Sequence, residues 1–512
     1  MTVPPKGDSI RAQLSSLDSP LYDDVPRIGI VLAAGHGTRI RSDTSKMLHE
    51  IWGRPTVERV ADALCDGLDS TNQILVVGIK AEQVAATVGA RPGRRFAYQE
   101  NPVLGLPAGT GDAVHVALEQ FDPLPDGRDR HIYIVPGDMG LLTELVVAEF
   151  RRAFEVRPCD MMVLTGGYEG PTEQNYYGRI VRVPEADVAG ASTGDDAGFV
   201  IAIKEHKDIL GLGDDDAVET LTYKAARFAF TRRQLLETQE INTLVVAFRE
   251  SALRAHIGAM NTDNVQGELM LTDLVEIFNG NGLDVRAVAA ADEEEILGFN
   301  VKSVWRQMES IARRRAYHRL MDIVTIVDEE DFYLADEVID QIIALDKDRG
   351  PLDIVVGKGV HLGPGVSLDR RVQLHDRCEL RGTIALGEGV DIGPGARLST
   401  HRGQQMVLEP GVEVLARSVL KGNLRIGVDS RIESGVIMTG SDEHPMRVGR
   451  DVTVKGTTYV YGCRIDDGVM IEHSVIKCRH VQCRTRIDGG VQPVRYVIPQ
   501  PEGLDSIAPL GE

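Results

Sequence analysis

The sequence contains no apolar run long enough to cross a membrane and no pair of cysteines spaced as C-x-x-C. The first absence argues against a membrane-spanning segment, because a spanning helix needs about 20 consecutive apolar residues. The six cysteines are widely spaced, which is typical of free thiols in a reducing compartment. The N-terminus also lacks the apolar core of a signal peptide. We therefore expect a cytoplasmic protein.

Positive charge is also scarce in this chain. Its 512 residues include 56 Lys and Arg against 77 Asp and Glu, which gives a formal net charge of −21. An acidic body of this kind argues against nucleic acid or an anionic membrane as the main partner. A site for an anionic ligand therefore has to be a local positive patch.

The length favours two domains, and the sequence pattern changes near the middle of the chain. In the first part, short apolar runs alternate with amphipathic segments. The runs at 28–34, 73–79 and 131–138 predict buried strands, and the segments between them predict helices. This alternation indicates a Rossmann-like α/β domain with a mainly parallel sheet. Ligands of such sheets gather beyond the carboxyl ends of the strands.

The second half repeats with a period of six residues. An aliphatic residue returns at every sixth position from Val356 to Leu398, and the register resumes after breaks near 399–407 and 439–447. A helix cannot use this period, whereas a triangular parallel β-helix is built from short hexad faces. The expected divisions are a polar, mobile N-terminal extension (1–26), the α/β domain (27–300), a helical connector (301–322), the β-helix (323–495) and a C-terminal tail (496–512).

The first predicted strand ends in a glycine loop, within "GIVLAAGHGTRIRSDTSK" (29–46). Closely spaced backbone N–H groups can bind a phosphate. The loop is, however, neither the dinucleotide-binding G-x-G-x-x-G nor the P-loop G-x-x-x-x-G-K-[ST]. On spacing alone, phosphate binding and a plain tight turn are equally good interpretations.

The residues around this loop resemble the signature of the sugar-1-phosphate nucleotidyltransferases, L-x-x-G-x-G-T-R-(M/L)-x(n)-P-K. Further segments that resemble this family follow in order: "AGTGDAV" (108–114), "VPGD" (135–138), "NYYGRIVR" (175–182), "IAIKEHKD" (201–208), "EINT" (240–243) and "NVQGELMLTD" (264–273). Over about residues 28–300 the sequence most resembles the bifunctional N-acetylglucosamine-1-phosphate uridyltransferase/glucosamine-1-phosphate acetyltransferase family. That resemblance also implies that the hexad repeats form a left-handed β-helix.

The resemblance implies a Mg²⁺-assisted reaction in which a sugar phosphate attacks the α-phosphorus of UTP and pyrophosphate leaves. Arg39 and Lys46 would supply the catalytic positive charge. Asp138 and Asn264 would hold Mg²⁺, an ion that prefers oxygen ligands. The residues implied for the nucleotide are Leu32, Ala33, Gly35, Gln99, Gly109 and Thr110, and those implied for the amino-sugar are Gly178, Glu205 and Asn242. Taken alone, Asp138 could cap a turn, Asn264 could cap a helix, and Glu205 could belong to a solvated face.

Four features depart from the family pattern, and the first is His36, the basic residue between the two glycines of the loop. Ser45 stands where a proline usually precedes the loop lysine, and Leu244 stands where the family prefers glycine after "EINT". The segment before Gly109 is several residues longer than the family's base-reading stretch. These added residues leave the preference for uracil over thymine open.

The second half lacks the segments that mark the family's acetyltransferase site, so a second, acetyl-CoA-dependent activity is not expected. His444 lies in the polar loop "GSDEHPM", where a general base and a loop-stabilising histidine are alternatives, and the second is favoured. Cys463, Cys478 and Cys483 are of metal-ligand type. Their spacing favours small residues that face into the coil over a zinc site.

The sequence therefore predicts an enzyme that makes UDP-N-acetylglucosamine, a cell-wall precursor, and pyrophosphate from UTP and N-acetylglucosamine 1-phosphate. Its partners would be these substrates and Mg²⁺, with neither nucleic acid nor a membrane, and its β-helices would assemble as a homotrimer. Two alternatives stay open. One is transfer from UTP or TTP to another sugar 1-phosphate, and the other is a sugar-nucleotide-binding regulatory subunit without turnover.

Overall fold

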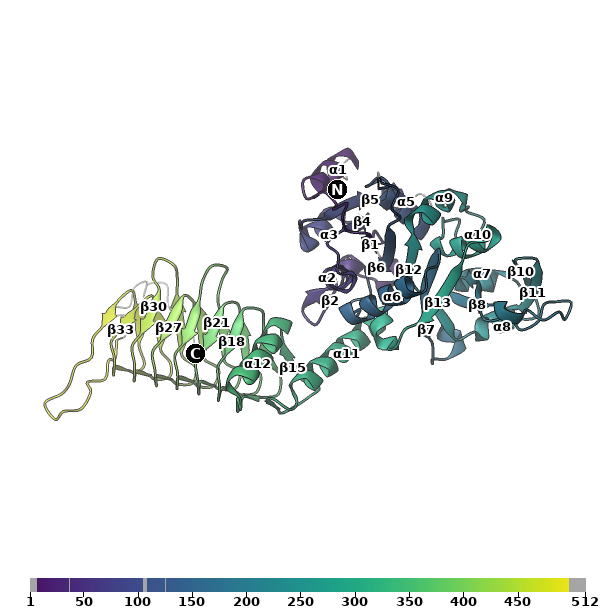
Figure 1. Cartoon of the computed structure of the whole chain (residues 1–512). Helices are drawn as coiled ribbons and strands as arrows, with labels where there is room; N and C mark the ends of the chain where they lie inside the picture. Colours follow the sequence, from purple (N-terminus) through teal and green to yellow (C-terminus); the bar gives the residue numbers. More distant parts are fainter. Residues whose placement is uncertain (1–6, 36, 105–107, 125, 497–512) are drawn as a thin grey trace, which may run out of the picture. The chain divides into compact units, whose positions relative to one another are not determined.

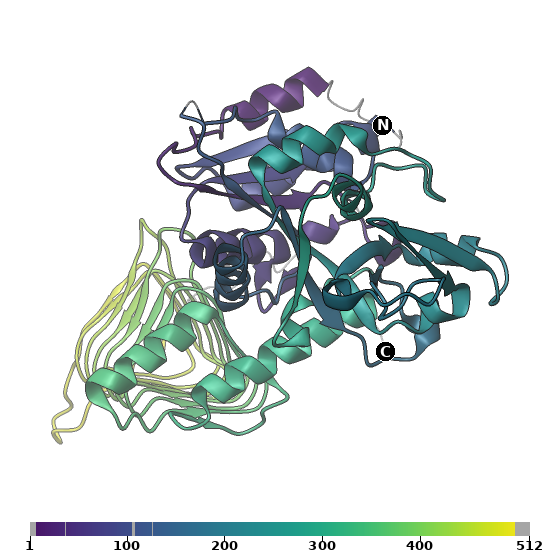
Figure 2. The same cartoon turned by 45° about the vertical axis from the view of Figure 1, so that its right-hand side comes forward.

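The computed structural model describes residues 7–35, 37–104, 108–124 and 126–496. The chain divides into two compact units, and the division falls inside a long helix, α11 (Lys302–Leu320), between Glu309 and Ser310. The first unit contains a sheet flanked by helices, and the second is a stack of short parallel strands (Figures 1 and 2). None of the helices in these ranges is long and apolar enough to cross a membrane.

A nine-stranded sheet forms the centre of the first unit. Its strands are β1 (Arg27–Ala33), β4 (Gln73–Val77), β5 (Arg94–Tyr98), β6 (His131–Pro136), β7 (Met161–Gly167), β8 (Arg179–Arg182), β9 (Val200–Lys204), β12 (Glu240–Arg249) and β13 (Val285–Ala289). The main path runs β13-β7-β12-β6-β1-β4-β5, with β8 beside β12 and β9 beside β8. β1 is parallel to both β4 and β6, whereas β12 is antiparallel to β6 and β7. The parallel strands around β1 confirm the predicted Rossmann-like α/β class.

Helices cover both faces of this sheet because successive side chains of a strand point to opposite faces. Val31 and Ala33 of β1 belong to one core, whereas Ile30 and Leu32 belong to the other. The first face carries α2 (Thr56–Leu68), α3 (Ala81–Val88) and α6 (Glu144–Val156), and the second carries α5 (Gly109–Leu118), α9 (Glu250–His256) and α10 (Leu274–Gly280). Burying one such aliphatic side chain stabilises the fold by about 1.5–3 kcal/mol. These two cores hold the carboxyl ends of the central strands rigidly in place.

A smaller lobe extends the sheet beyond β12. Its elements are β8, β9, α7 (His206–Gly211), the hairpin of β10 (Val218–Tyr223) and β11 (Ala226–Thr231), and α8 (Arg232–Glu237). They share a third apolar core that includes Val181, Ile201 and Phe228. Because β8 pairs with both β12 and β9, this lobe places the residue before β8 (Gly178) and the residue after β9 (Glu205) near β12.

The N-terminal extension is docked rather than loose. α1 (Gly7–Ser15) buries Ile10 and Leu14 in the core that also contains α2 and α3. After the helix, a carboxylate oxygen of Asp18 accepts a hydrogen bond from the backbone N–H of Phe96 at 2.8 Å. The expectation of a mobile extension is therefore wrong where the structure describes it, because these contacts fix the segment against the edge strand β5.

Three parallel sheets form the second unit. The first contains β14 (Thr325–Ile326), β16 (Val355–Val356), β19 (Gln373–Leu374), β22 (Asp391–Ile392), β25 (Glu413–Val414), β28 (Arg431–Ile432), β31 (Thr453–Val454) and β34 (Met470–Ile471). The second contains β15 (Phe332–Leu334), β17 (Val360–Leu362), β20 (Glu379–Arg381), β23 (Arg397–Ser399), β26 (Val419–Gly422), β29 (Ile437–Gly440), β32 (Tyr459–Tyr461) and β35 (Val475–Lys477). The third contains β18 (Val366–Leu368), β21 (Ile384–Leu386), β24 (Met406–Leu408), β27 (Leu424–Ile426), β30 (Met446–Val448), β33 (Arg464–Ile465) and β36 (His480–Val481).

Successive hexads visit the three sheets in turn, as a left-handed parallel β-helix requires. Leu362, Leu368 and Leu374 lie on different sheets, and Leu380 begins the next turn beside Leu362. All four side chains are buried, which confirms the predicted repeat. The two predicted breaks are the loops between β23 and β24 and between β29 and β30. A helix that the repeat did not predict, α12 (Asp336–Arg349), packs against β18.

Candidate active site

The glycine loop leaves β1 at the carboxyl edge of the sheet. Leu32 pairs with Val76 of β4 and Pro136 of β6, so the loop starts beside the ends of two parallel neighbours. A Cβ built at Gly35 would meet nothing within 4 Å, so packing does not explain a glycine there. His36 lies outside the described residues. Arg39, in the short helix that follows, is exposed and makes no ion pair within the described ranges. The loop therefore leaves room and an uncompensated charge at this edge.

The loop lysine is held at the centre of a small polar cluster. Lys46 is only 7% exposed, and its Nζ forms an ion pair with Asp138, which follows β6. The same Nζ donates to Oδ1 of Asn300 at 2.7 Å and lies 5.6 Å from the ring centroid of Phe299. At Gly37, where φ is +75°, a Cβ would come within 2.9 Å of the lysine side chain. The structure thus brings Lys46 and Asp138 together, as the sequence predicts for one site.

Asn264 does not join this cluster. Its Oδ1 accepts from the backbone N–H groups of Gln266 and Glu268 at 3.1 and 3.3 Å, and its Nδ2 donates to the Glu268 carbonyl at 2.7 Å. These bonds close a local turn and use both ends of the amide. The asparagine beside Asp138 and Lys46 is instead Asn300, which sequence reasoning missed. Its only local signal is its place directly after the buried Phe299, in "LGFN".

The oxygens of this cluster fit a small divalent cation. Asp138 offers a carboxylate and Asn300 an amide oxygen, and both already surround one cationic group, the Lys46 ammonium. At Gly298 a Cβ would lie 3.3 Å from Oδ1 of Asp138, so the missing side chain lets the 298–300 segment approach the carboxylate. Mg²⁺ prefers such oxygen donors and fills its shell with waters and phosphate oxygens. The donor set is therefore suitable for Mg²⁺ bound together with a phosphate ligand.

The predicted base-binding residues form a second group. Gln99 directly follows β5 and is 4% exposed, and its Nε2 donates to the Gly109 carbonyl at 3.0 Å and to Asp112 at 2.8 Å. Gly109 has φ of +86°, and a Cβ there would lie 2.2 Å from the Leu269 carbonyl oxygen. Thr110 Oγ1 accepts from the N–H of Leu271 at 3.0 Å. The start of α5 is therefore pinned against Gln99. Residues 105–107 of the lengthened stretch lie outside the described residues, and α4 (Asn101–Leu104) precedes them.

The predicted sugar-binding residues meet where β8, β9 and β12 end or begin. The Gly178 carbonyl accepts from the N–H of Asn242 at 2.8 Å. A Cβ at Gly178 would lie 3.2 Å from Oε1 of Glu205, so a larger residue there would require this carboxylate to shift by a few tenths of an ångström. Burial, followed by repulsion from Asp208 and Asp273, raises the pKa of Glu205 to about 7. The three predicted residues are thus neighbours. The raised pKa of the Glu205 carboxyl means that this group changes charge near neutral pH.

Leu244 occupies a strained position beside this group. Its φ is +64°, a conformation that glycine adopts at little cost and that a branched side chain rarely adopts. The residue lies in a bulge of β12, between Asn242 and Val245, where the pairing with β7 shifts. Its N–H donates to Oδ1 of Asn242 at 3.0 Å. Leu244 therefore adopts the backbone conformation that glycine would favour. The bulge still positions the Asn242 side chain, which accepts a hydrogen bond from the Leu244 N–H.

Ser45, the other departure in the loop, is fully buried. Its hydroxyl has no hydrogen-bond partner among the described residues, although its carbonyl accepts from the N–H of Leu48 at 2.9 Å. A proline here would keep that carbonyl and lack the hydroxyl. Serine therefore preserves the loop's backbone and adds an unsatisfied polar atom beside Lys46.

The β-helix candidates show weaker arrangements. His444 is exposed in the loop after β29, where its N–H donates to Ser441 Oγ at 3.0 Å and its ring packs edge-on at 6.1 Å from Tyr461. Its described contacts are those of a loop-stabilising residue. Cys463 is buried as expected, whereas Cys478 and Cys483 are exposed, so the inward-facing interpretation is wrong for these two. Within the described ranges no group of three His, Cys, Asp or Glu could hold a metal ion.

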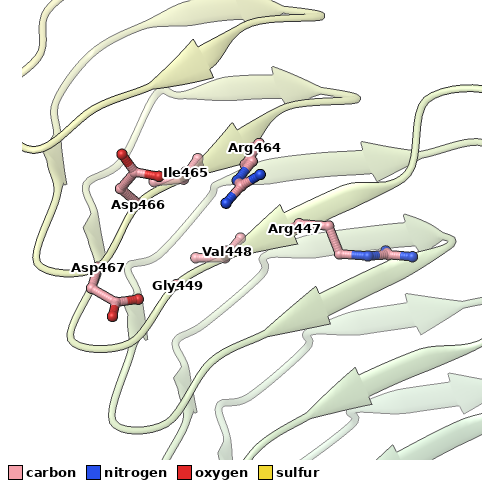
Figure 3. A pocket seen from close by; sticks show the side chains of 7 residues that line it. All are labelled: Arg447, Val448, Gly449, Arg464, Ile465, Asp466 and Asp467. Atoms are coloured by element: carbon pink, nitrogen blue, oxygen red, sulfur yellow. The ribbon is translucent and has the colours of Figure 1, made fainter.

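A surface hollow of about 470 Å³ lies between β30 and β33. Arg447 and Arg464 stand on adjacent turns there, and Arg447 extends away from Asp466 and Asp467 (Figure 3). The two aspartates are already engaged, with His480 and with the N–H of Arg450. The hollow contains none of the predicted site residues.

The fold and the loop geometry define a nucleotidyltransferase domain followed by a β-helix. Residues 29–180 match the family model of the MobA-like NTP transferase domain. The chain is also similar to a solved nucleoside-diphosphate-sugar pyrophosphorylase from Vibrio cholerae, at 14% identity and a TM-score of 0.36, over 55% of this chain and 99% of that one. The first unit therefore contains the matched NTP transferase domain.

The chain belongs to the GlmU family. It is 30% identical over 437 residues to the bifunctional protein GlmU of Corynebacterium efficiens, an alignment that covers 84% of this chain and 76% of that protein. It is also 30% identical over 443 residues to the bifunctional protein GlmU of an Exiguobacterium species, covering 85% and 84%. Both alignments span far more than the matched transferase domain. The resemblance noted in the sequence is therefore confirmed at the level of the family.

Proposed function

We propose that the protein transfers a uridylyl group from UTP to N-acetylglucosamine 1-phosphate, giving UDP-N-acetylglucosamine and pyrophosphate. The observation that carries this proposal is the cluster of Lys46, Asp138 and Asn300 beside an open glycine loop at the carboxyl edge of the sheet. Membership of the GlmU family supports the choice of UTP and of this sugar. Each part of the proposed reaction then has a group in this chain to perform it.

The positive groups of the loop neutralise charge during the reaction. The sugar phosphate attacks the α-phosphorus in line, and negative charge gathers on the pyrophosphate that leaves. Arg39 and Lys46 lie on the same loop, so both side chains can reach phosphate oxygens held by the backbone of Gly35 and its neighbours. Positive groups that contact the phosphate oxygens in the transition state typically contribute about 10²–10³ in rate.

Asp138 and Asn300 would hold Mg²⁺, which supplies Lewis-acid polarisation of the phosphate oxygens when bound. Asn300 replaces Asn264 in this proposal because the Asn264 amide is committed to its own turn. Asn264 still serves the site, since its turn leads to Leu269, whose carbonyl fixes the start of α5.

The remaining predicted residues would select the two substrates. Leu32 and Ala33 carry the backbone toward the nucleotide, and Gln99 would contact the base beside Gly109 and Thr110. The Glu205 carboxylate, with Gly178 and Asn242, would accept hydrogen bonds from the amino-sugar. The β-helix would hold the protein as a homotrimer, and we assign it no acetyl transfer.

Pyrophosphate release from UTP and N-acetylglucosamine 1-phosphate, with Mg²⁺, tests this proposal. The wild type should turn over, and Asp138→Asn should lower the rate by about 10²-fold or more. Asp126→Asn is the matched control, because this carboxylate is exposed and pairs with Arg128. TTP and glucose 1-phosphate, tested in the same assay, measure the base and sugar preference.

Two results would contradict the proposal. Faster turnover with TTP or with another sugar phosphate would reassign the substrate. Binding of UDP-N-acetylglucosamine without turnover of any sugar phosphate would make the protein a regulatory subunit. A parallel thiol-release assay with acetyl-CoA and glucosamine 1-phosphate is expected to give no signal above the rate without enzyme.

A further inference from the structure

The Lys46 ammonium contacts the two oxygens that fit a divalent cation. It pairs with Asp138, makes no second ion pair within the ranges that the structure describes, and donates to Oδ1 of Asn300 at 2.7 Å. The side chains of Lys46 and Asp138 are 8% and 12% exposed, so water screens this pair only weakly. A lysine that instead contacted phosphate would have to leave both oxygens.

We propose that Lys46 is a cation placeholder. Its ammonium occupies the position between Asp138 and Asn300, and it moves toward the triphosphate when a divalent cation takes these oxygens. This inference rests on the proposed function, because it assumes that Asp138 and Asn300 are the metal ligands. It adds a second role for Lys46, which is to keep a buried carboxylate compensated between catalytic cycles.

Electrostatics requires the exchange. An ammonium and a divalent cation on one carboxylate would lie within about 4 Å, where like charges in a poorly hydrated site repel strongly. A buried carboxylate left without a partner is also strongly unfavourable. One of the two cations must therefore be present, and the other must be elsewhere. The triphosphate offers Lys46 an alternative set of oxygens, so the metal and the nucleotide favour each other's binding reciprocally.

The loop geometry gives Lys46 a short path. Its side chain runs directly against Gly37, where a Cβ would come within 2.9 Å of it. Gly35, two residues earlier, faces open space. The lysine therefore lies along the wall of the loop that would hold the phosphates, and rotation about its side-chain bonds can move the ammonium without moving the backbone.

Binding of Mn²⁺ to the nucleotide-free protein, followed by electron paramagnetic resonance, tests the inference. Lys46→Gln removes the charge and keeps hydrogen-bond donors, so it should bind Mn²⁺ about tenfold more tightly than the wild type, or better. Lys46→Met is the second variant, and Mn²⁺ should raise its Tm more than that of the wild type. Arg39→Gln removes one charge from the same loop, away from these contacts, and should change the affinity by less than about threefold.

The outcomes separate this inference from the proposed function. Asp138→Asn should weaken Mn²⁺ binding. If it does, but neither Lys46 variant binds Mn²⁺ more tightly, the placeholder role is refuted and the metal site stands. If Asp138→Asn leaves Mn²⁺ binding unchanged, the metal site itself fails, and both proposals fall. Equal tightening in Arg39→Gln and Lys46→Gln would show a general charge effect and would also refute the placeholder.

Discussion

Replacing Glu205 by Gln is expected to stabilise the first unit at pH 8 and to leave its stability near pH 5 little changed. Burial, followed by repulsion from Asp208 and Asp273, raises the pKa of the Glu205 carboxyl from 4.5 to about 7. Between these two pKa values the folded protein holds a proton that the unfolded chain has lost. The free energy of unfolding of the wild type therefore falls as the pH rises from about 4.5 to 7, and then levels off. Glutamine carries no such proton.

The structure sets the size of this effect. A change of one pKa unit corresponds to 1.36 kcal/mol, so a shift from 4.5 to about 7 limits the effect to about 3 kcal/mol. Glu205 keeps partial exposure to solvent, which screens its charge. The expected gain of Glu205→Gln at pH 8 is therefore about 1–2 kcal/mol.

Urea unfolding followed by tryptophan fluorescence measures the free energy of unfolding of the first unit, which contains Glu205. The chain has two tryptophans, Trp52 and Trp305, and both lie in the first unit. Curves for wild type and Glu205→Gln at pH 5, 6, 7 and 8 give the difference in the free energy of unfolding at each pH. Glu82→Gln, on the exposed side of α3, is the control. A difference between wild type and Glu205→Gln that does not grow with pH would refute the reasoning.

Two further substitutions test the packing around the site. Gly109→Ala should destabilise the first unit by more than the roughly 1–2 kcal/mol that a left-handed backbone costs a residue with a Cβ, because the new Cβ would lie 2.2 Å from the Leu269 carbonyl oxygen. Gly213→Ala, at φ of +99° with nothing within 4 Å, is the control in urea unfolding, and equal losses in both would contradict the clash. Leu14→Ala should release α1, because Leu14 is 3% exposed and supplies much of its apolar contact. Faster amide hydrogen exchange along β5, absent in the exposed-site control Gln13→Ala, would report this release, and unchanged exchange would rule it out.

The β-helix was the most predictable part of the fold because its signal repeats. Each hexad places one aliphatic side chain inward, so an error at one position is corrected by the next. The buried run from Leu362 to Leu398 follows this rule throughout. α12 has no such repeat, since it interrupts the first turns and packs by its own apolar face. A periodic signal therefore predicts the coil and says little about insertions.

The docking of α1 could not be predicted for a different reason. The segment has only two buried apolar side chains, Ile10 and Leu14, in an otherwise polar sequence. Such a short stripe is equally typical of a solvated helix. What fixes the segment is tertiary: it covers the edge strand β5, and Asp18 accepts a hydrogen bond from the Phe96 N–H that the edge leaves free. The sequence alone does not show which strand lies at the edge of the sheet, so the segment that packs against this edge cannot be predicted without the strand order.

The same logic explains which parts of the candidate site the sequence predicted. The sequence assigns Lys46 and Asp138 to one site, and the structure brings them together because β1 and β6 are parallel neighbours, whose following loops share one edge of the sheet. The two asparagines could not be ranked in this way. Asn264 belongs to a motif of the family, yet its side-chain amide forms hydrogen bonds within its own turn. Asn300 lies further along the chain than the edge strand β13, directly after the buried Phe299, and it accepts a hydrogen bond from Lys46. A contiguous motif can therefore predict which loop belongs to the candidate site. The path of the chain decides which distant side-chain oxygen lies beside Lys46 and Asp138.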